Sequence, residues 1–344
     1  MGEEELHLGD IEIEDGEPTD KGLLEIGKYV ADSIADNIKR ISRAPQHQHD
    51  KLRGIEDIKE VGAKIKISVA DQTIKDTIDD LTEKGVGSVR VYSEERGITS
   101  SGKDERGIFM VLSPLDCGSG RWLGYSNPDV AVSVALGKCS DLPGTDSFES
   151  IRAGVVKNAF NPWSFYAVSV DDYDGKGNSS FCYDSHSMRE RGISVHPISC
   201  IGGSRLVIDY DSGEGGEKEH IARHEALSDI RARVDWFKTD SNTSDLCGVA
   251  SRSYDGFIGF GGRIKFQDIA AVKFVIERAG GVFKTHLAAG YGGNLLELLS
   301  QSSPEEAQRS LGETRFNVIA TSTAELNKKI EDHARGYLTR YSAE

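Results

Sequence analysis

Apolar residues recur at three- and four-residue intervals in several stretches of the chain, and this spacing predicts amphipathic helices. The first helix follows Asp20, a residue type suited to the N-cap position, and its apolar face runs from Leu23 to Ile41. A second helix is expected directly after Asp71. Further helices are predicted over residues 222–233, 243–251, 269–279 and 324–335. The chain therefore carries helices from one end to the other.

Strands are predicted between these helices, where apolar residues alternate with polar ones or form short runs bounded by Gly, Asn and Asp. They lie near residues 65–69, 86–92, 107–116, 256–262 and 315–323, and the region from 129 to 211 is rich in further strands. The Gly-rich strand GFIGFGG does not match the dinucleotide-binding fingerprint, so strand bulges and close packing explain its glycines better. At 344 residues, we expect two domains or one large layered fold.

Composition narrows the class of protein. The net charge of −15 disfavours a nucleic-acid partner, and no run approaches the roughly 20 apolar residues that a membrane span needs, so we expect neither nucleic acid nor membrane as a partner. Residues 1–18 have the composition of a flexible acidic tail and not of a secretory signal, which favours a cytoplasmic protein. Five cysteines without a Cys-x-x-Cys pair favour reduced thiols.

Four acidic residues stand at the ends of predicted strands or the starts of predicted helices. They are Asp71, Glu94, Asp116 and Asp268. Side chains at such positions often converge on one site in layered α/β proteins, and converging carboxylates suit Mg²⁺, which prefers oxygen ligands. The alternative for each residue alone is a helix cap or a solvated acid. The acids thus predict a metal site only if the fold brings them together.

The combination of motifs is more specific than any one acid. SEERG at Glu94, PLD ending at Asp116, and DIAA at Asp268 with AGG eleven residues beyond resemble the Mg²⁺-dependent, lithium-sensitive phosphatases. This superfamily includes inositol monophosphatase and fructose-1,6-bisphosphatase, and the similarity is greatest to its archaeal members. It extends from about Asp20 to His333.

The resemblance implies an α-β-α-β-α sandwich, with a metal site between an N-terminal half over residues 19–190 and a C-terminal half over residues 191–344. It also implies hydrolysis of a sugar or inositol phosphate by a metal-activated water, and a homodimer. By position, the metal ligands would be Glu94, Asp116, Asp268 and the carbonyl of Leu115, and Asp71 would orient the water. The substrate contacts would be Cys117, Gly118, Ser119, Asn242, Thr243 and Arg263.

The sequence departs from the superfamily pattern at its central motif. Ser113 stands where an Asp bridges two metal ions, and a neutral hydroxyl cannot share a negative charge between two cations. Gly118 stands where a Thr or Ser pairs with the acid at Asp71, and Ser119 is a possible substitute. Two alternatives remain open: a working phosphatase with an altered Mg²⁺ or Mn²⁺ site, or a phosphate-binding relative with weakened catalysis.

Two other patterns point to different chemistry. His220 and His224 have a zinc-like spacing, but they lack the intervening Glu of the metalloprotease motif, so a solvated helix face is favoured. Cys117 would have a lowered pKa at a helix N-terminus, but no His is assignable as its base, which disfavours covalent catalysis.

Overall fold

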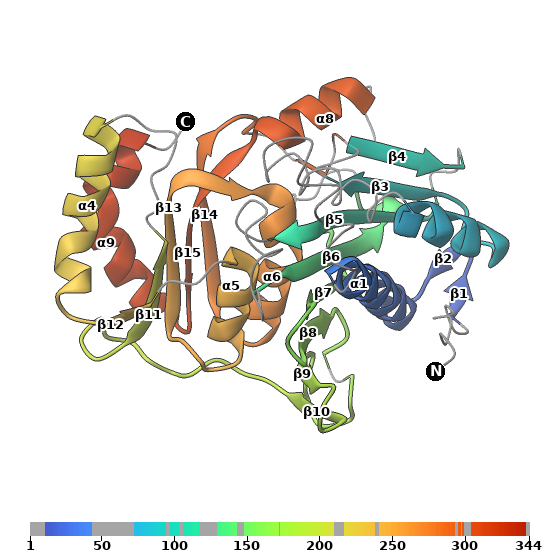
Figure 1. Cartoon of the computed structure of the whole chain (residues 1–344), viewed down its shortest axis with the longest axis horizontal. Helices are drawn as coiled ribbons and strands as arrows, with labels where there is room; N and C mark the ends of the chain where they lie inside the picture. Colours follow the sequence, from blue (N-terminus) through green and yellow to red (C-terminus); the bar gives the residue numbers. More distant parts are fainter. Residues whose placement is uncertain are drawn as a thin grey trace.

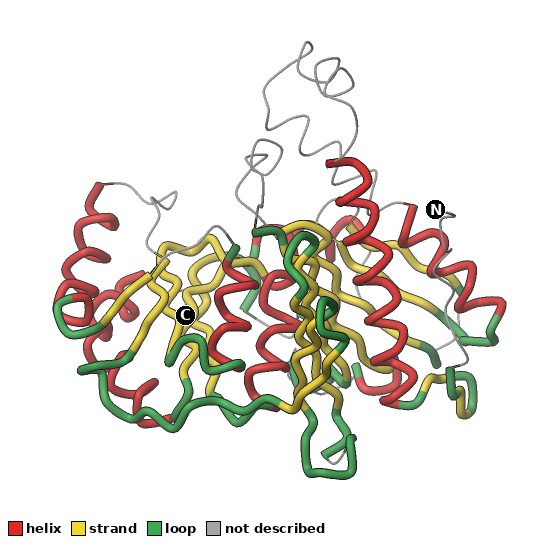
Figure 2. The backbone as a smooth tube through the Cα atoms, turned by 60° about the horizontal axis from the view of Figure 1, so that its bottom comes forward, coloured by secondary structure: helices red, strands yellow, loops and turns green. Residues whose placement is uncertain are grey.

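The structure is a computed structural model. It describes residues 11–42, 72–93, 97–102, 106–116, 129–142, 148–171, 173–209, 217–237, 241–292, 295–296, 298 and 304–341. Two sheets stand side by side with helices outside and between them (Figures 1 and 2). The strand predicted over residues 65–69 lies outside the described residues.

The larger sheet has eight strands in the order β10-β9-β8-β7-β6-β5-β3-β4. It consists of β3 (Val89–Ser93), β4 (Gly97–Ser101), β5 (Ile108–Asp116), β6 (Ala131–Lys138), β7 (Ala153–Asn158), β8 (Trp163–Val168), β9 (Ser180–Asp184) and β10 (Arg189–Gly192). Neighbouring strands are antiparallel except β3 and β5, which are parallel. A single 3₁₀ turn, η2 (Cys139–Asp141), follows β6.

The smaller sheet has five strands in the order β12-β11-β13-β15-β14. It consists of β11 (Arg205–Asp209), β12 (Asp235–Phe237), β13 (Gly256–Lys265), β14 (Val282–Ala289) and β15 (Arg315–Thr321). Strand β11 is parallel to both its neighbours, whereas β15 is antiparallel to β13 and β14. The chain passes from the larger to the smaller sheet between residues 192 and 205.

Helices cover both sheets and separate them. Helix α1 (Asp20–Ser42) and the helix over residues 72–83 pack on the outer face of the larger sheet. Helices α5 (Asn242–Ala250) and α6 (Phe266–Arg278) lie between the sheets, and α4 (Glu217–Arg231) and α9 (Ala324–Tyr341) cover the outer face of the smaller one (Figure 1). Helix α8 (Pro304–Glu313) lies against β4. This order confirms the predicted α-β-α-β-α sandwich.

Three apolar cores fill the spaces between the five layers. Alternate residues of β5 enter different cores, because successive side chains point to opposite faces of a strand. Phe109 and Val111 enter the central core around α6, whereas Met110 and Leu112 enter the core under α1. Burial on both faces explains why β5 is a continuous apolar run and not an alternating one.

The glycines of β13 lie at an irregularity in its pairing with β15. Gly259 pairs with Val318 and Ile264 with Phe316, so the intervening residues bulge out of register. The buried side chain of Asn317 accepts the backbone N–H groups of Gly261 and Gly262 at 3.0 and 3.3 Å. The interpretation of this stretch as a bulged strand is therefore confirmed.

The N-terminal segment differs from the flexible tail expected for residues 1–18. Strands β1 (Ile13–Glu14) and β2 (Glu17–Pro18) form a hairpin whose turn residues Asp15 and Gly16 both have positive φ. The carboxylate of Glu17 accepts the N–H of Gly107 at 3.1 Å and the hydroxyl of Ser140 at 3.0 Å. These long-range bonds hold residues 11–18 against the larger sheet. Residues 1–10 lie outside the described residues.

No helix in the described part of the chain combines the length and the apolar character needed to cross a lipid bilayer.

Two Gly→Ala substitutions should change the stability in opposite directions, because one glycine is packed under α6 and the other is exposed on α9. A Cβ at Gly154 would lie 2.8 Å from the carbonyl oxygen of Ala271 on α6, so Gly154→Ala must push the helix from the sheet and is expected to lower the free energy of unfolding by about 1–3 kcal/mol. Gly336 is exposed on α9 with nothing within 4 Å of its Cβ position, so Gly336→Ala should stabilise the protein by up to about 1 kcal/mol. Urea unfolding of both variants measures the two effects, and equal effects would contradict the packing.

Candidate active site

The candidate site begins at an irregularity near the end of β5. Ser113 pairs with Ser133 of β6 and Asp116 pairs with Ala131, so three steps along β5 match two along β6. In a regular strand, residues three apart point to opposite faces, but one extra residue restores the same face. Pro114 lies within the irregularity, where its missing N–H costs no regular ladder bond. Ser113 and Asp116 can therefore both face the central helices.

Ser113 is joined to Asp268 across the two halves of the chain. Its buried hydroxyl donates to Oδ1 of Asp268 at 3.1 Å. Asp268 lies in the first turn of α6, and its Oδ2 accepts the backbone N–H of Lys265 at 3.3 Å, which is a helix-capping contact. The carboxylate is thus fixed by one bond from its own helix and one from β5.

Asp116 lies at the N-terminus of α5. Its Oδ2 accepts the backbone N–H of Thr243 at 2.7 Å and the hydroxyl of Ser241 at 3.1 Å. Ser241 is the N-cap of this helix, and its side-chain oxygen also accepts the N–H of Ser244. A carboxylate in this position is stabilised by unpaired helical N–H groups and by the positive end of the helix dipole.

Thr243 connects the two acids. Its N–H donates to Asp116, and its hydroxyl donates to the carbonyl oxygen of Asp268 at 3.2 Å. The side chain is fully buried, so both of its donors are engaged within the site. This geometry supports a positioning role for Thr243 in place of the expected substrate contact. Together with Ser113, it holds two acids that are 152 positions apart in the sequence (268 − 116) close to one another.

The electrostatics of the pair are unfavourable without a positive charge. Burial raises the pKa of Asp268 to about 7, and the negative charge of Asp116 adds to this effect. The ammonium group and the N–H of Lys265 and the hydroxyl of Ser113 act in the opposite direction. A buried carboxyl whose pKa is raised by a neighbouring carboxylate forms with it a site suited to a cation, because a bound cation favours the ionised form.

A third acid extends the network and was not predicted from the sequence. Oδ1 of Asp129 accepts the hydroxyl of Ser244 at 2.9 Å and the side-chain N–H of Asn158 at 2.5 Å. Asp129 thus joins the first turn of α5 to β7. A serine shortly before the predicted helix indicates an N-cap, and this residue is Ser241. No local pattern in the sequence indicates which carboxylate this serine contacts.

The other predicted site residues are placed as follows. Asp71, Glu94, Cys117, Gly118 and Ser119 lie outside the described residues. The backbone of Leu115 is part of β5. Asn242 is the first residue of α5 and is partly exposed, and Arg263 is exposed near the end of β13. Within the described ranges, no third His, Cys, Asp or Glu completes a metal-binding cluster. Among the described side chains, the oxygens of Asp116, Asp268 and Ser113 lie together at this site.

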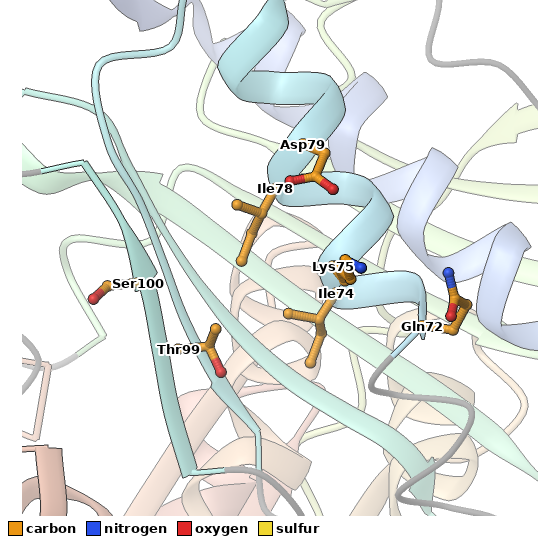
Figure 3. Close-up of a pocket in the computed structure, with 7 residues that line it drawn as sticks. All are labelled: Gln72, Ile74, Lys75, Ile78, Asp79, Thr99 and Ser100. Atoms are coloured by element: carbon orange, nitrogen blue, oxygen red, sulfur yellow. The ribbon is translucent and has the colours of Figure 1, made fainter.

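A cavity of about 480 Å³ lies elsewhere, between the helix over residues 72–83 and β4. Ile74 and Ile78 point from the helix toward Thr99 on the strand (Figure 3). Its lining includes one ammonium group, from Lys75, and one carboxylate, from Asp79. None of the predicted site residues with described side chains lines this cavity, so it does not form the carboxylate site.

The two histidines lie on α4, and the buried Arg223 stands between them in the sequence. The rings of His220 and His224 are 4.5 Å apart, and Nδ1 of His220 is 3.3 Å from Nη2 of Arg223. Arg223 is fully buried and donates to the carbonyl oxygen of Phe260. The guanidinium group of Arg223 beside His220 disfavours a cation at this pair, and both histidines are partly exposed.

The raised pKa of Asp268 predicts a pH dependence of stability without metal. In the unfolded chain this carboxyl titrates near 4, so the folded state is penalised as the pH rises from about 4 to about 7. In EDTA at pH 8, Asp268→Asn should raise the melting temperature by about 2–6 °C, and the gain should shrink toward pH 5. Asp332→Asn on the exposed face of α9 is the control. A gain that does not change with pH would contradict the assignment.

The chain is similar to known proteins over most of its length. No model of a known protein family matches it. It is 27% identical over 318 residues to a protein named fructose-1,6-bisphosphatase/inositol-1-monophosphatase from Methanothermobacter thermautotrophicus, and the match covers 88% of this chain and 94% of that one.

Solved structures share the fold. The extragenic suppressor protein suhB from Bartonella henselae matches with a TM-score of 0.59 at 19% identity, over 91% of this chain and 98% of that one. An inositol monophosphate-bound structure of SaIMPase-II matches with a TM-score of 0.60 at 13% identity, over 94% and 99% of the two chains. The chain therefore has the five-layer fold of these structures and is similar in sequence to the Methanothermobacter protein over most of both chains.

Proposed function

We propose that the protein is a phosphatase that hydrolyses a phosphate monoester of a small sugar or inositol, with Mg²⁺ as its cofactor. The observation that carries this proposal is the pair of acids, Asp116 and Asp268, joined between the two halves of the chain by Ser113 and Thr243. The relative named fructose-1,6-bisphosphatase/inositol-1-monophosphatase supports the substrate class, because its similarity covers 94% of its own length.

The donor set fits a hard divalent cation. Asp116 accepts the hydrogen bonds from Ser241 and Thr243 with Oδ2, so within the described part of the chain its Oδ1 is available to a ligand. The oxygens of Asp268 each accept one hydrogen bond and retain a second lone pair. Mg²⁺ is held by a few carboxylates together with water and substrate phosphate, which matches two acids better than a cage of many ligands.

The remaining ligands and contacts in the proposal follow from the superfamily motifs. Glu94 and the carbonyl of Leu115 would complete the cation site, and Asp71 would hold a proton of the attacking water. The backbone N–H groups of Cys117, Gly118 and Ser119 would hold the phosphate, because N–H groups at a helix N-terminus bind anions. Asn242 and Arg263 would contact the rest of the substrate. When bound, the cation lowers the pKa of water and stabilises the charge of the transition state.

Ser113 favours a second candidate, a phosphate-binding protein with weakened catalysis. Its side chain is 2% exposed, and its hydroxyl donates to Asp268, whereas an Asp at this position would add a second negative charge beside that carboxylate. A neutral residue therefore reduces the repulsion within the site but also reduces its charge for binding cations. A lower affinity for Mg²⁺ or a change in preference toward Mn²⁺ is the expected consequence.

A direct assay separates the two functions. Purified protein should release phosphate from fructose 1,6-bisphosphate, inositol 1-phosphate or p-nitrophenyl phosphate, with a rate that increases with Mg²⁺ or Mn²⁺ concentration. Asp116→Asn should lower kcat/KM at least about a hundredfold, because it removes a charged ligand. The amide oxygen can still accept from the N–H of Thr243, so the fold should persist, and a melting curve checks this. A wild-type rate no higher than that of the variant would favour the non-catalytic candidate.

The role of Ser113 predicts opposite effects of two substitutions. Ser113→Asp restores an anionic ligand and should lower the Mg²⁺ concentration that gives half-maximal activity about tenfold. Ser113→Ala removes the hydroxyl that orients Asp268 and should raise that concentration. Metal titrations of activity measure both effects. If Ser113→Asp leaves the titration unchanged or lowers the rate, the site is built around serine and the assignment of a weakened bridging position is incorrect.

A further inference from the structure

A second cavity, of about 190 Å³, lies on the other side of the larger sheet from the carboxylate pair. Its lining includes Val155 and Tyr166, which belong to the core under α1. The carboxylate pair instead lies at the N-termini of α5 and α6, in the central layer. The cavity is therefore separated from the candidate active site by the thickness of the sheet.

The floor of the cavity is one row of side chains across four strands. Lys157 on β7 pairs with Ser164 on β8, Ser164 pairs with Tyr183 on β9, and Tyr183 pairs with Glu190 on β10. Directly paired residues of antiparallel strands point to the same face of a sheet. All four residues line the cavity. The next row contributes Val155 and Tyr166, which pair with each other.

The roof of the cavity comes from α1. Lys28 and Asp32 are one helical turn apart, and both line the cavity. The ammonium group of Lys28 lies 4.2 Å from the centroid of the Tyr166 ring, and Asp32 forms an ion pair with Lys157 at 2.7 Å. Lys28 and Asp32 thus each link α1 to the sheet, one through a cation–π contact and the other through an ion pair.

Two residues in the lining carry a buried hydroxyl that has no hydrogen-bond partner among the described residues. They are Ser164 and Tyr166, which are 7% and 2% exposed. A buried hydroxyl without a partner costs free energy comparable to a lost hydrogen bond, so native proteins rarely leave one unsatisfied. Two such residues on the same face of one strand, both lining one cavity, indicate a site built for a ligand with hydrogen-bonding groups.

We propose that this cavity binds a small neutral polyol, such as a cyclitol or a monosaccharide. The charges of the roof are already compensated within the chain, since Lys157 pairs with Asp32 and Lys28 pairs with Glu25 at 3.1 Å. Among the buried groups of the lining, the unmet hydrogen-bonding capacity therefore belongs to neutral hydroxyls. A charged ligand would have to compete with these ion pairs, whereas a neutral one would leave them intact.

The mixed polarity of the lining also favours a polyol. Each ligand hydroxyl both donates and accepts, so it can donate to a carboxylate such as Glu190, accept from an ammonium group such as that of Lys28, and pair with Ser164 or Tyr166. The apolar side of a sugar ring can lie against Val155. The cavity has room for several water molecules at about 30 Å³ each, which a ligand of monosaccharide size would displace.

Thermal shift and calorimetry on the full chain test this site. With EDTA present and phosphate absent, myo-inositol, glucose and fructose are titrated, together with glycine as a zwitterion. At least one polyol should raise the melting temperature and release heat, whereas glycine should not. Tyr166→Phe and Ser164→Ala should each weaken polyol binding about threefold to tenfold, the effect of one lost neutral hydrogen bond.

Stability without ligand provides a second readout. Tyr166→Phe removes an unsatisfied hydroxyl, so the melting temperature without ligand should stay the same or rise. Thr77→Val is the matched control, because Thr77 also carries a buried hydroxyl without a partner but does not line the cavity. It should leave polyol binding unchanged. Absence of binding by all three polyols, binding of glycine in their place, or polyol binding that survives both cavity substitutions would overturn the proposal.

Discussion

The arrangement of this protein depends on a helix that is buried on two sides. Helix α6 lies between two sheets, and its side chains at Ile269, Val272 and Val275 are fully buried in the core that both sheets share. The faces of α6 that contact the sheets are apolar, and its polar side chains lie at its N-terminus, as Asp268 does, or on a partly exposed stripe with Lys273 and Glu277. Close approach of the helix to the sheet also requires a very small residue, as at Gly154 beneath Ala271.

The location of the carboxylates follows from this constraint. The N–H groups of Lys265 and Thr243, at the N-termini of α6 and α5, donate to the carboxylates of Asp268 and Asp116 and offset part of the cost of burying their charges. Asp268 is also linked to the other half of the chain through Ser113, and Asp116 is linked to the other half through Thr243 and Ser241. The same bonds that cap the helices therefore fix the distance between the two acids.

Much of the fold was predictable from local patterns. The apolar run at residues 108–112, the helix at residues 266–278 with Gly280 and Gly281 after it, and the last strand and helix all follow from periodicity and end signals. Both acids were identified because strand ends and helix starts are recognisable in the sequence.

The remaining features depend on contacts that no local pattern contains. The hairpin of residues 13–18 looked like a tail because its stability comes from bonds such as Glu17 to Ser140, 123 positions away. Thr243 looked like a substrate contact because its position in the motif does not reveal that its hydroxyl is bonded to the backbone of Asp268. The role of Asp129 likewise depends on a tertiary contact, with Ser244.

At the irregularity in β5, the identity of each residue and the number of residues affect the site in different ways. Because one extra residue turns Asp116 back toward the central layer, the count between Ser113 and Asp116 determines which face of the sheet carries the acid. A change of side chain at residue 113 alters the charge of the site and leaves its geometry in place. Loss or gain of one residue would turn Asp116 toward the core under α1 and away from the N–H group of Thr243 at the start of α5. This segment therefore tolerates substitution far better than a change in length.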